Sequence, residues 1–316
     1  MEELLAGLRA AAEATRVRIL FALSQGEFNV SELTQILGQS QPRVSRHLKL
    51  MTEAGLISRH KEGNWVLFRI RDEGAGGALA RAIVDLKPGT DAELARDQAR
   101  LADVRSRRAK TASEYFRANA ARWEELRSLH VREEDVEQAM LRLAGPAPVE
   151  LHADLGTGTG SVLRYFAALA SQSIGIDQSL DMLAMARVNL EKAGLGNVQV
   201  RQGDIYALPF ANAFADFITI HQVLHYLDDP GRALIEAARI LQPGGRLLVA
   251  DFAPHELEQL RDNHAHRRLG VAAEHMAAWL QRAGMRLIQH DVLPPPWRKG
   301  ETGLTVSLWL AEKPRW

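Results

Sequence analysis

The sequence predicts two domains in one chain: an N-terminal helical domain with a short β-ribbon, and a C-terminal α/β domain. The second is expected to have a mostly parallel seven-stranded sheet that closes with an antiparallel hairpin. Apolar residues recur at helical spacing near the N-terminus, and after residue 148 apolar runs alternate with helix-like segments. A length of 316 residues suffices for two cores. We therefore expect domains at 1–90 and 146–316, with linking helices at 91–145.

The composition limits both the chemistry and the compartment. The chain has no cysteine, which excludes disulfides, thiolate metal sites and cysteine nucleophiles. Its formal net charge is zero, so any contact with nucleic acid has to come from a local basic patch. The N-terminus lacks the pattern of a signal peptide, and no stretch approaches the ~18 apolar residues of a membrane span. We expect a cytoplasmic protein that does not enter the membrane.

The first part of the chain predicts helices followed by paired strands. For the helix expected at 30–38, Ser31 is a candidate N-cap and Gly38 is a candidate C-terminal end. The glycine-rich residues 73–77 predict a flexible break. The expected elements are helices at 3–24, 30–38, 41–54 and 78–86, an alternating stretch at 57–71, and a charged helix at 91–128 interrupted near 109–113.

Residues 31–50 have the pattern of a helix-turn-helix. Residues 58–65 have the pattern of a turn between two strands with basic side chains at its tip, which is typical of a wing. Val44, Leu48 and Met51 would face inward, which leaves the polar side chains of the second helix exposed. Between residues 39 and 71, seven Lys and Arg stand against two Glu, the local patch that DNA requires. The residues expected to contact DNA are Gln41, Arg43, Ser45, Arg46, His47, Lys49, Arg59 and Lys61.

The run Val-Ser-Arg-His-Leu at 44–48, followed by Glu-Ala-Gly-Leu at 53–56, resembles ArsR-type winged-helix repressors over about residues 5–75. The resemblance implies a homodimer that binds an inverted repeat in double-stranded DNA and pairs through its terminal helices. Metal-sensing members carry a Cys-Val-Cys box where this chain has Asn29-Val30-Ser31, so soft-metal sensing is not expected there. The alternative is a winged helix that serves only protein contacts or dimerisation.

Residues 149–160 predict a strand followed by a glycine-rich turn into a helix. Glycines at 156, 158 and 160 let a backbone pass close to a ligand. A nicotinamide dinucleotide would also suit such a turn, although its usual last glycine is Ser161 here. Asp154 favours a ligand with an ammonium group over a pyrophosphate. Two further strands are expected to end at 174–177 and at 202–205. Others are expected at 217–221, 246–251, 286–292 and 305–311, with a turn at 241–245.

This series, with Asp-Leu-Gly-Thr-Gly-Thr-Gly at 154–160, resembles class I S-adenosylmethionine-dependent methyltransferases over about residues 112–316, particularly the ubiquinone and menaquinone biosynthesis group. The resemblance implies S-adenosylmethionine or S-adenosylhomocysteine as ligand. Tyr115 and Phe116 would cap the cofactor or, equally, pack a helix on the sheet. The implied contacts are Gly156, Thr157, Gly158 and Gly160 to the methionine part, Asp177, Gln178 and Met182 to the ribose, Asp204 and Ile205 to adenine, and His221 near the sulfonium.

Methyl transfer needs a general base only when the acceptor must lose a proton. His221 and His225 are the candidate catalytic residues, and a role in packing the core or the cofactor is at least as strong an alternative for each. His264, His266, Arg267 and Arg268 are candidates to line an acceptor pocket. No metal site is expected. Arsenite methylation is also excluded, because that chemistry resembles a cysteine-dependent process and the chain has no cysteine.

Two functions follow as hypotheses. The first is a transcriptional regulator whose methyltransferase domain senses the cofactor, its product or a small-molecule acceptor. The second is an active small-molecule methyltransferase with an accessory DNA-binding domain. The acceptor cannot be named from the sequence.

Overall fold

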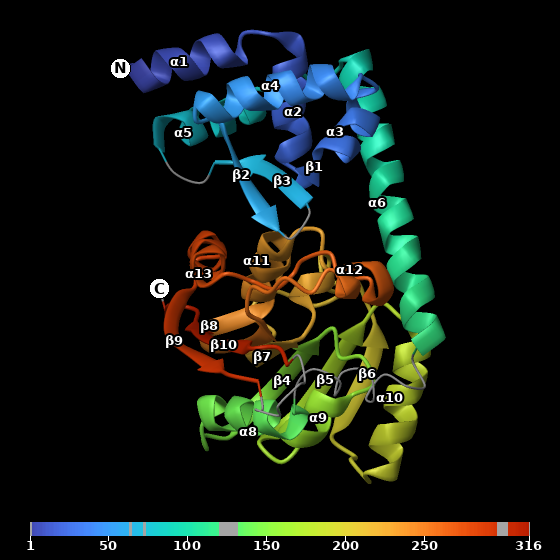
Figure 1. The fold of residues 1–316 in the computed structure, drawn as a ribbon. Coiled ribbons are helices and arrows are strands. Elements are labelled where there is room, and N and C mark those ends of the chain that lie inside the picture. Colours follow the sequence, from blue (N-terminus) through green and yellow to red (C-terminus); the bar gives the residue numbers. More distant parts are fainter. Residues whose placement is uncertain (1, 63–64, 72–73, 120–131, 296–302, 316) are drawn as a thin grey trace. The chain divides into compact units, whose positions relative to one another are not determined.

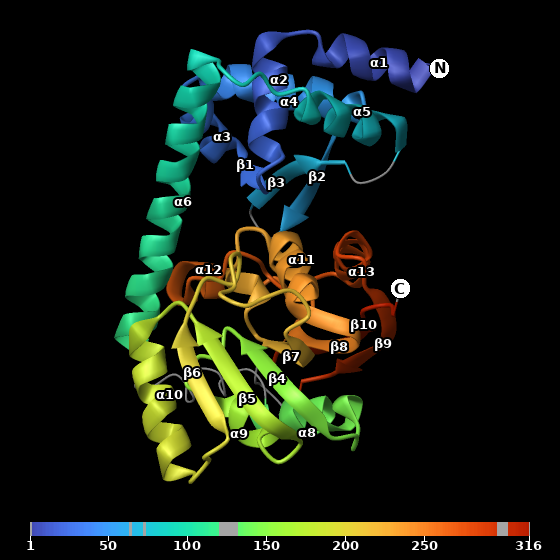
Figure 2. The same ribbon diagram turned by 180° about the vertical axis from the view of Figure 1, so that it is seen from behind.

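The computed structural model describes residues 2–62, 65–71, 74–119, 132–295 and 303–315. The chain forms two compact units, Met1–Thr111 and Ala112–Trp316. The expected linking segment is divided between them, because its first part belongs to the first unit and the rest to the second. Figures 1 and 2 show the elements of both units.

The first unit is a bundle of helices with a small antiparallel sheet in the order β1-β3-β2. The single helix expected at 3–24 is two helices, because the Glu13 carboxylate caps a new helix by accepting from the Arg16 N–H at 3.0 Å. The elements are α1 (Glu2–Ala11), α2 (Ala14–Leu23), β1 (Phe28–Asn29), α3 (Val30–Leu37), α4 (Gln41–Glu53), β2 (Ile57–Glu62), β3 (Trp65–Ile70), α5 (Gly74–Asp85) and the start of α6 (Ala92–Asn119).

The N-cap of α3 is Asn29 rather than Ser31. The Asn29 side chain accepts from the Glu32 N–H, and the Glu32 carboxylate accepts from the Asn29 N–H, each at 3.0 Å. This reciprocal pair satisfies two donors that a serine two residues later could not reach. The expected end at Gly38 is confirmed, since Gly38 adopts a left-handed conformation with φ of 63°.

The flexible break expected at residues 73–77 is wrong, because helix α5 begins at Gly74. Gly76 and Gly77 are buried within this helix. A Cβ on Gly76 would lie 2.4 Å from the carbonyl oxygen of Gly55, and one on Gly77 would lie 2.2 Å from that of Arg71. These glycines therefore allow close packing of a helix on backbone, which composition alone does not distinguish from flexibility.

The core of the first unit combines the helix-turn-helix with the start of α6. Val44, Leu48 and Met51 are buried, as their spacing predicts. Leu101 and Val104 of α6 belong to the same apolar cluster. Helix α6 continues without the interruption expected near residues 109–113. It supplies residues to both units: its early turns to the first, its last turns to the second.

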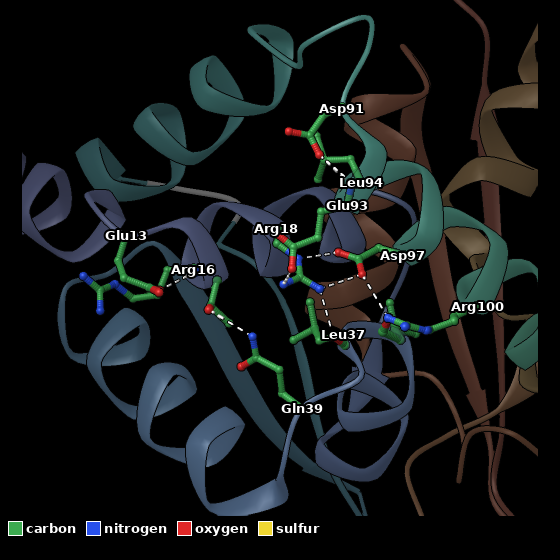
Figure 3. Close-up of polar contacts among 12 residues, drawn as sticks. Glu13, Arg16, Arg18, Leu37, Gln39, Asp91, Glu93, Leu94, Asp97 and Arg100 are labelled. Atoms are coloured by element: carbon green, nitrogen blue, oxygen red, sulfur yellow. Dashed lines mark hydrogen bonds and ion pairs between the residues drawn. The ribbon is translucent and has the colours of Figure 1, made fainter.

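A buried ion pair fixes the start of α6 within the first unit (Figure 3). The Arg18 guanidinium on α2 donates to both carboxylate oxygens of Asp97 at 2.6 and 2.7 Å and to Glu93 at 2.6 Å. It also donates to the carbonyl of Leu37, the last residue of α3, at 2.9 Å. The hydrogen bond to Asp97 raises the pKa of Arg18. One guanidinium therefore joins α2, the end of α3 and α6.

The second unit has a seven-stranded sheet in the order β6-β5-β4-β7-β8-β10-β9. The strands from β6 to β8 are parallel, and β10 is antiparallel to both β8 and β9, which confirms the expected sheet. The strands are β4 (Val149–Leu155), β5 (Ala170–Asp177), β6 (Val198–Gln202), β7 (Ala215–His221), β8 (Leu241–Phe252), β9 (Arg286–Leu293) and β10 (Val306–Glu312).

Helices cover both faces of this sheet. Helices α11 and α13 pack on one face, and α8 and α9 pack on the other (Figure 1). Successive residues of β7 alternate between these layers: Phe217 faces α8 and α9, and Ile218 faces α11 and α13. The helices are α8 (Glu133–Ala144), α9 (Ser161–Phe166), α10 (Leu180–Lys192), the 3-10 turn η2 (Leu224–Tyr226), α11 (Pro230–Ile240), α12 (Gln259–His264) and α13 (Ala273–Arg282). Within the described residues, no helix is both long and apolar enough to cross a bilayer.

Candidate functional site

A cavity of about 860 Å³, counted with the solvent at its mouth, lies at the carboxyl ends of the parallel strands β4, β5 and β7. The chain runs outward from β4 to β6 and then returns to the other side of β4 as β7, and such a reversal is where open α/β sheets bind ligands. Its described lining is Phe116, Asp154, Gly156, Thr157, Gly158, Val162, Ile176, Asp177, Gln178, Met182, Gly203, Ile205, His221, Gln222, Val223, Tyr226 and Leu227.

The glycine-rich turn forms one wall because side chains would not fit there. Gly156 has a φ of 77°, and a Cβ on it would lie 2.4 Å from the Val223 side chain. Asp177 at the end of β5 holds the turn, since its carboxylate accepts from the N–H of Gly158 at 2.8 Å. Its other oxygen accepts from the Ser179 N–H at 2.8 Å, so both oxygens face backbone donors. The turn and Asp177 are thus one structural unit.

Burial raises the pKa of the Asp177 carboxyl above its usual range, and the hydrogen bonds from Ser179 and Gly158 oppose this effect. A carboxylate held by backbone N–H groups at the edge of a cavity is well placed to accept from the hydroxyls of a ribose. It therefore offers a hydrogen-bond acceptor whose position is fixed by the backbone around it.

A chain of hydrogen bonds through the sheet holds Asp154, the other acid of the cavity. The Thr219 hydroxyl donates to the Asp154 carboxylate at 2.6 Å, so its oxygen is left to accept from Nε2 of His152 at 2.8 Å. Nδ1 of His152 then accepts from the Ser173 hydroxyl, 3.3 Å away. Burial lowers the pKa of His152 to about 3, which keeps the ring neutral. The donor directions along the chain all follow from the Thr219 hydroxyl donating to Asp154.

Most of the expected cofactor contacts line this cavity. These are Asp154, Gly156, Thr157, Gly158, Asp177, Gln178, Met182, Ile205 and His221. Two of the expected contacts lie elsewhere among the described residues. Gly160 is the N-cap of α9, and Asp204 is exposed and accepts from the Tyr206 N–H at 2.9 Å. The Tyr115 side chain lies outside the described residues, and its neighbour Phe116 lines the cavity.

The residues that sequence reasoning missed belong mainly to the segment after β7. Gln222, Val223, Tyr226 and Leu227 all line the cavity. Gln222 adopts a left-handed conformation with φ of 55°, rare for a side chain other than glycine or asparagine. The signal that could have found them is their position directly after His221, at the carboxyl end of a parallel strand. Neither a motif nor a periodicity marks them.

The candidate DNA-contacting face lies on α4 and the β2 strand of the first unit. Gln41, Arg43, Ser45, Arg46 and Lys49 are exposed, and so are Arg59 and Lys61 on β2. His47 differs from this set, since its side chain is 12% exposed and its Nδ1 lies 3.6 Å from the Glu13 carboxylate. Burial lowers the pKa of His47. We therefore separate His47, which packs between helices, from the exposed basic residues.

Comparisons with known families match each half of the chain separately. Residues 13–59 match the model of the bacterial regulatory protein arsR family, and residues 153–249 match the model of a methyltransferase domain. Each model covers less than half of the chain, and together they fall on the two units described above.

The curated relatives match only part of the chain. An uncharacterized methyltransferase, YcgJ of Bacillus subtilis, is 33% identical over 33% of this chain and 41% of its own length. The ubiquinone/menaquinone biosynthesis C-methyltransferase UbiE of Vibrio cholerae is 36% identical over 37% of this chain and 46% of its own length. An uncharacterized 37.1 kDa protein in transposon TN4556 of Streptomyces fradiae is 40% identical over 35% of this chain and 33% of its own. The match thus spans less than half of each relative.

Solved structures share the fold. The putative methyltransferase bound to the Haloferax volcanii Trm112 methyltransferase activator has a TM-score of 0.52 at 23% identity, over 64% of this chain and 97% of that one. The Bacillus YcgJ structure has a TM-score of 0.50 at 21% identity, over 57% of this chain and 99% of its own. At these identities the likeness establishes the Rossmann-like fold of the second unit.

A methyltransferase domain of this fold takes S-adenosylmethionine as cofactor, and the cavity fits that molecule. The charged side chains of the described wall are the acids Asp154 and Asp177, and none of the described lining residues is a lysine or an arginine. Such a wall favours a cationic sulfonium with an ammonium group and disfavours a pyrophosphate. Among the described residues, the buried Thr157 hydroxyl has no hydrogen-bond partner, so it can bond to a ligand.

Proposed function

Because the chain joins an arsR-family DNA-binding domain to a methyltransferase domain, we propose that it is a transcriptional regulator that senses occupancy of its S-adenosylmethionine cavity. The observation that supports this proposal most is helix α6. Its residue Asp97 is paired with Arg18 in the core of the DNA-binding unit, and its residue Phe116 lines the cavity of the other unit. One continuous helix therefore carries residues of both functions.

Phe116 packs within a small cluster at the cavity wall. Its ring lies edge-on to Tyr226, with centroids 4.8 Å apart, and the same cluster contains the buried Met182. A ligand that fills the cavity would favour one arrangement of these side chains. Because a ligand shifts only states that it binds unequally, sensing requires that this arrangement differ between the DNA-bound and free protein.

We propose the following roles for the residues that would hold the cofactor. Asp154 would pair with the ammonium group, Asp177 would accept from the ribose hydroxyls, and Met182 and Ile205 would pack near the nucleoside. The bound cofactor would supply an activated methyl group on its sulfonium. The residues of this chain would orient it and exclude water, the main protein contribution to a displacement of this kind.

On the DNA side we propose a homodimer that binds an inverted repeat with half-sites about one helical turn apart. Leu4, Leu5 and Leu8 on α1 are exposed apolar residues on one helix, at 38%, 42% and 45%, and suit a contact between two copies. The exposed basic residues of α4 and β2 would then lie against the phosphates and base edges.

The test follows binding at both units at once. Duplex DNA that the full-length protein binds would be selected from a random pool, and its affinity measured by fluorescence anisotropy with S-adenosylmethionine, with S-adenosylhomocysteine and with neither. A change of roughly fivefold or more, the lower end of typical coupling between sites, is expected with one of them. Equal affinity in all three conditions, with calorimetry showing that both ligands bind, would exclude sensing of the cofactor.

The alternative is an active small-molecule methyltransferase with an accessory DNA-binding domain. A buried histidine beside the cavity favours it: His225 is 1% exposed and paired with Asp251, as described below. This alternative predicts turnover that is unaffected by DNA, and a DNA affinity that is unaffected by the cofactor. The same titration therefore separates the two functions.

A further inference from the structure

His225 and Asp251 form a buried pair next to the cofactor cavity. His225 lies in η2, immediately before Tyr226, whose ring forms part of the cavity wall. Asp251 lies near the carboxyl end of β8. Nδ1 of His225 is 2.7 Å from the Asp251 carboxylate, and the two side chains are 1% and 0% exposed. The pair is therefore held at the same sheet edge as the cavity.

The contacts of Asp251 determine which ring nitrogen of His225 carries the proton. Its carboxylate also accepts from the backbone N–H groups of Leu224 at 2.8 Å and Phe252 at 2.7 Å. A carboxylate that accepts from several N–H groups is an acceptor for the imidazole too, so Nδ1 of His225 donates, and in the neutral ring the lone pair is on Nε2. This tautomer follows from donor and acceptor chemistry alone.

Nε2 of His225 is the unusual atom in this arrangement. It is buried, and it has no hydrogen-bond partner in the described structure. Buried polar side-chain atoms in folded proteins nearly always have a partner, and each exception calls for an explanation. Asp251 satisfies only Nδ1, so the lone pair of Nε2 is not used by any donor among the described residues.

The groups packed around His225 come from several elements. Its ring lies against Tyr226 and Phe252, with centroids 4.1 and 5.0 Å away, and against His266 at 4.2 Å. Its carbonyl accepts from the N–H groups of Arg267 and Arg268 at 2.8 and 3.1 Å. The Arg267 side chain is paired with Asp228 at 2.6 Å. The ionisable side chains in direct contact with the imidazole are therefore those of Asp251, Tyr226 and His266.

From this geometry we propose that Asp251 positions His225 as the proton acceptor of a methyl transfer, so that the acceptor is a hydroxyl compound or a carbon acid. The proposal rests on the proposed binding of S-adenosylmethionine. In the step, the bond between sulfur and methyl breaks as the new bond to oxygen or carbon forms. The sulfur keeps the electron pair as a neutral thioether, and the proton of the acceptor moves to Nε2 of His225.

The class of acceptor follows from this balance. A tertiary amine or a thioether has no proton to lose and gains nothing from a base. A phenol, an alcohol or a 1,3-dicarbonyl compound does have one, and needs a neutral imidazole beside the attacking atom. The tautomer fixed by Asp251 therefore selects for acceptors that carry an ionisable proton.

The first experiment needs no acceptor. Heteronuclear NMR of the full-length protein with isotope-labelled histidine, saturated with S-adenosylhomocysteine, reports the tautomer of His225. We expect the proton on Nδ1 in the wild type, and its transfer to Nε2 in Asp251→Asn, because an amide N–H would donate to Nδ1. A proton on Nε2 in the wild type, or the same tautomer in both proteins, would overturn the positioning role of Asp251.

The second experiment measures methyl transfer from labelled S-adenosylmethionine to simple probes: phenols and 1,3-dicarbonyls on one side, a tertiary amine and a thioether on the other. We expect transfer to the first group only. Asp251→Asn and His225→Gln should each lower it by about 100-fold or more, with the acidic limb of the pH profile displaced in Asp251→Asn. Asp262→Asn, an exposed aspartate on α12, is the matched control and should keep the wild-type rate.

Calorimetry with S-adenosylmethionine separates the failure of this proposal from that of the proposed function. Cofactor bound by all variants, with transfer only to the proton-free probes or to none of the probes, would overturn the role of His225 and leave cofactor binding intact. A wild type that binds neither cofactor form would instead contradict the proposed function itself.

Discussion

Nε2 of His152 and the hydroxyl of Thr219 form a 2.8 Å hydrogen bond inside the sheet, and the same hydroxyl donates to Asp154 at 2.6 Å. A histidine remote from the cavity surface thereby fixes a carboxylate that lines it. These hydrogen bonds run in one direction only. The Asp154 carboxylate can only accept, so the Thr219 hydroxyl donates to it and the His152 ring donates to that hydroxyl. The position of Asp154 is thus set from within the core.

Thr219→Val keeps the shape of the side chain and removes the hydroxyl. We expect a loss of about 1–3 kcal/mol in the free energy of unfolding, because the His152 N–H and a carboxylate oxygen both lose a partner. The affinity for S-adenosylmethionine should fall as well. Urea unfolding and calorimetry measure the two effects. Thr159→Val is the control, since the buried Thr159 hydroxyl has no hydrogen-bond partner among the described residues. Equal losses in both variants would contradict the proposed relay.

The low pKa of His152 predicts a specific dependence of stability on pH. Burial lowers the pKa of the ring from 6.5 to about 3 in the folded protein. Between these values the unfolded chain binds a proton that the folded chain does not, so stability is retained above pH 6.5 and is lost as the pH falls toward 3. The slope from this residue approaches about 1.4 kcal/mol per pH unit. Chemical unfolding at several pH values should show a shallower slope in His152→Asn than in the wild type.

Asp177→Asn tests the ribose contact while it keeps the size of the side chain. We expect S-adenosylmethionine to bind roughly 10-fold or more weakly, the cost of losing a charge-assisted hydrogen bond. Asp181→Asn, an exposed aspartate on the adjacent helix α10, should bind the cofactor as the wild type does. Both variants should retain the DNA affinity of the cofactor-free protein. Wild-type cofactor affinity in Asp177→Asn would remove this residue from the site.

Arg18→Met breaks the pair that holds α6 to α2 and leaves Asp97 buried without its partner. Removal of one member of such a pair costs about 3–5 kcal/mol. If α6 transmits occupancy of the cavity, the effect of the cofactor on DNA affinity should also disappear, while the affinity for the cofactor stays the same. Arg18→Lys keeps the charge without the bidentate geometry and should be intermediate. Arg96→Met, at an exposed position of α6, controls for the substitution itself.

The exposed residues of α4 predict which substitutions weaken DNA binding. Arg43→Ala and Arg46→Ala should each cost about 1–3 kcal/mol at a base contact, or reduce the salt dependence at a phosphate contact. His47→Gln should act less directly, because the His47 ring lies against Glu13. Arg142→Ala, an exposed change in the second unit, should leave anisotropy titrations unchanged. If His47→Gln proved the most damaging of these, the separation of this residue from the DNA face would be wrong.

The sequence predicted the strands of the second unit because buried strands consist of runs of mostly apolar residues, such as Phe217–Ile220. It also predicted the two acids of the cavity, because Asp154 stands just before the glycine-rich turn and Asp177 ends a strand. The cavity residues Gln222, Val223, Tyr226 and Leu227 were missed, since their position depends on the left-handed backbone at Gln222 and on Asp251, which is distant in the chain. No local pattern carries such information.

In the first unit, too, some features of the helices follow from the sequence pattern and others depend on particular side-chain contacts. The positions of Val44, Leu48 and Met51 follow from spacing alone, and the structure buries all three. The boundary between α1 and α2 does not follow from spacing, because the apolar stripe continues across Glu13. Only the N-cap formed by the Glu13 carboxylate marks the start of the new helix. Asn29 and Ser31 are both good capping residues, and the reciprocal bond to Glu32 decides between them.

Strand β10 lies between β8 and β9, and six consecutive residues of it, from Val306 to Ala311, are buried. During synthesis on a ribosome, this segment emerges after every other strand of the sheet. Until then β8 and β9 have no partner on the sides that β10 will fill, whereas the first unit has long been complete. A nascent chain could therefore present a finished DNA-binding unit before its cofactor domain has closed, and a premature stop near residue 305 would release such a form.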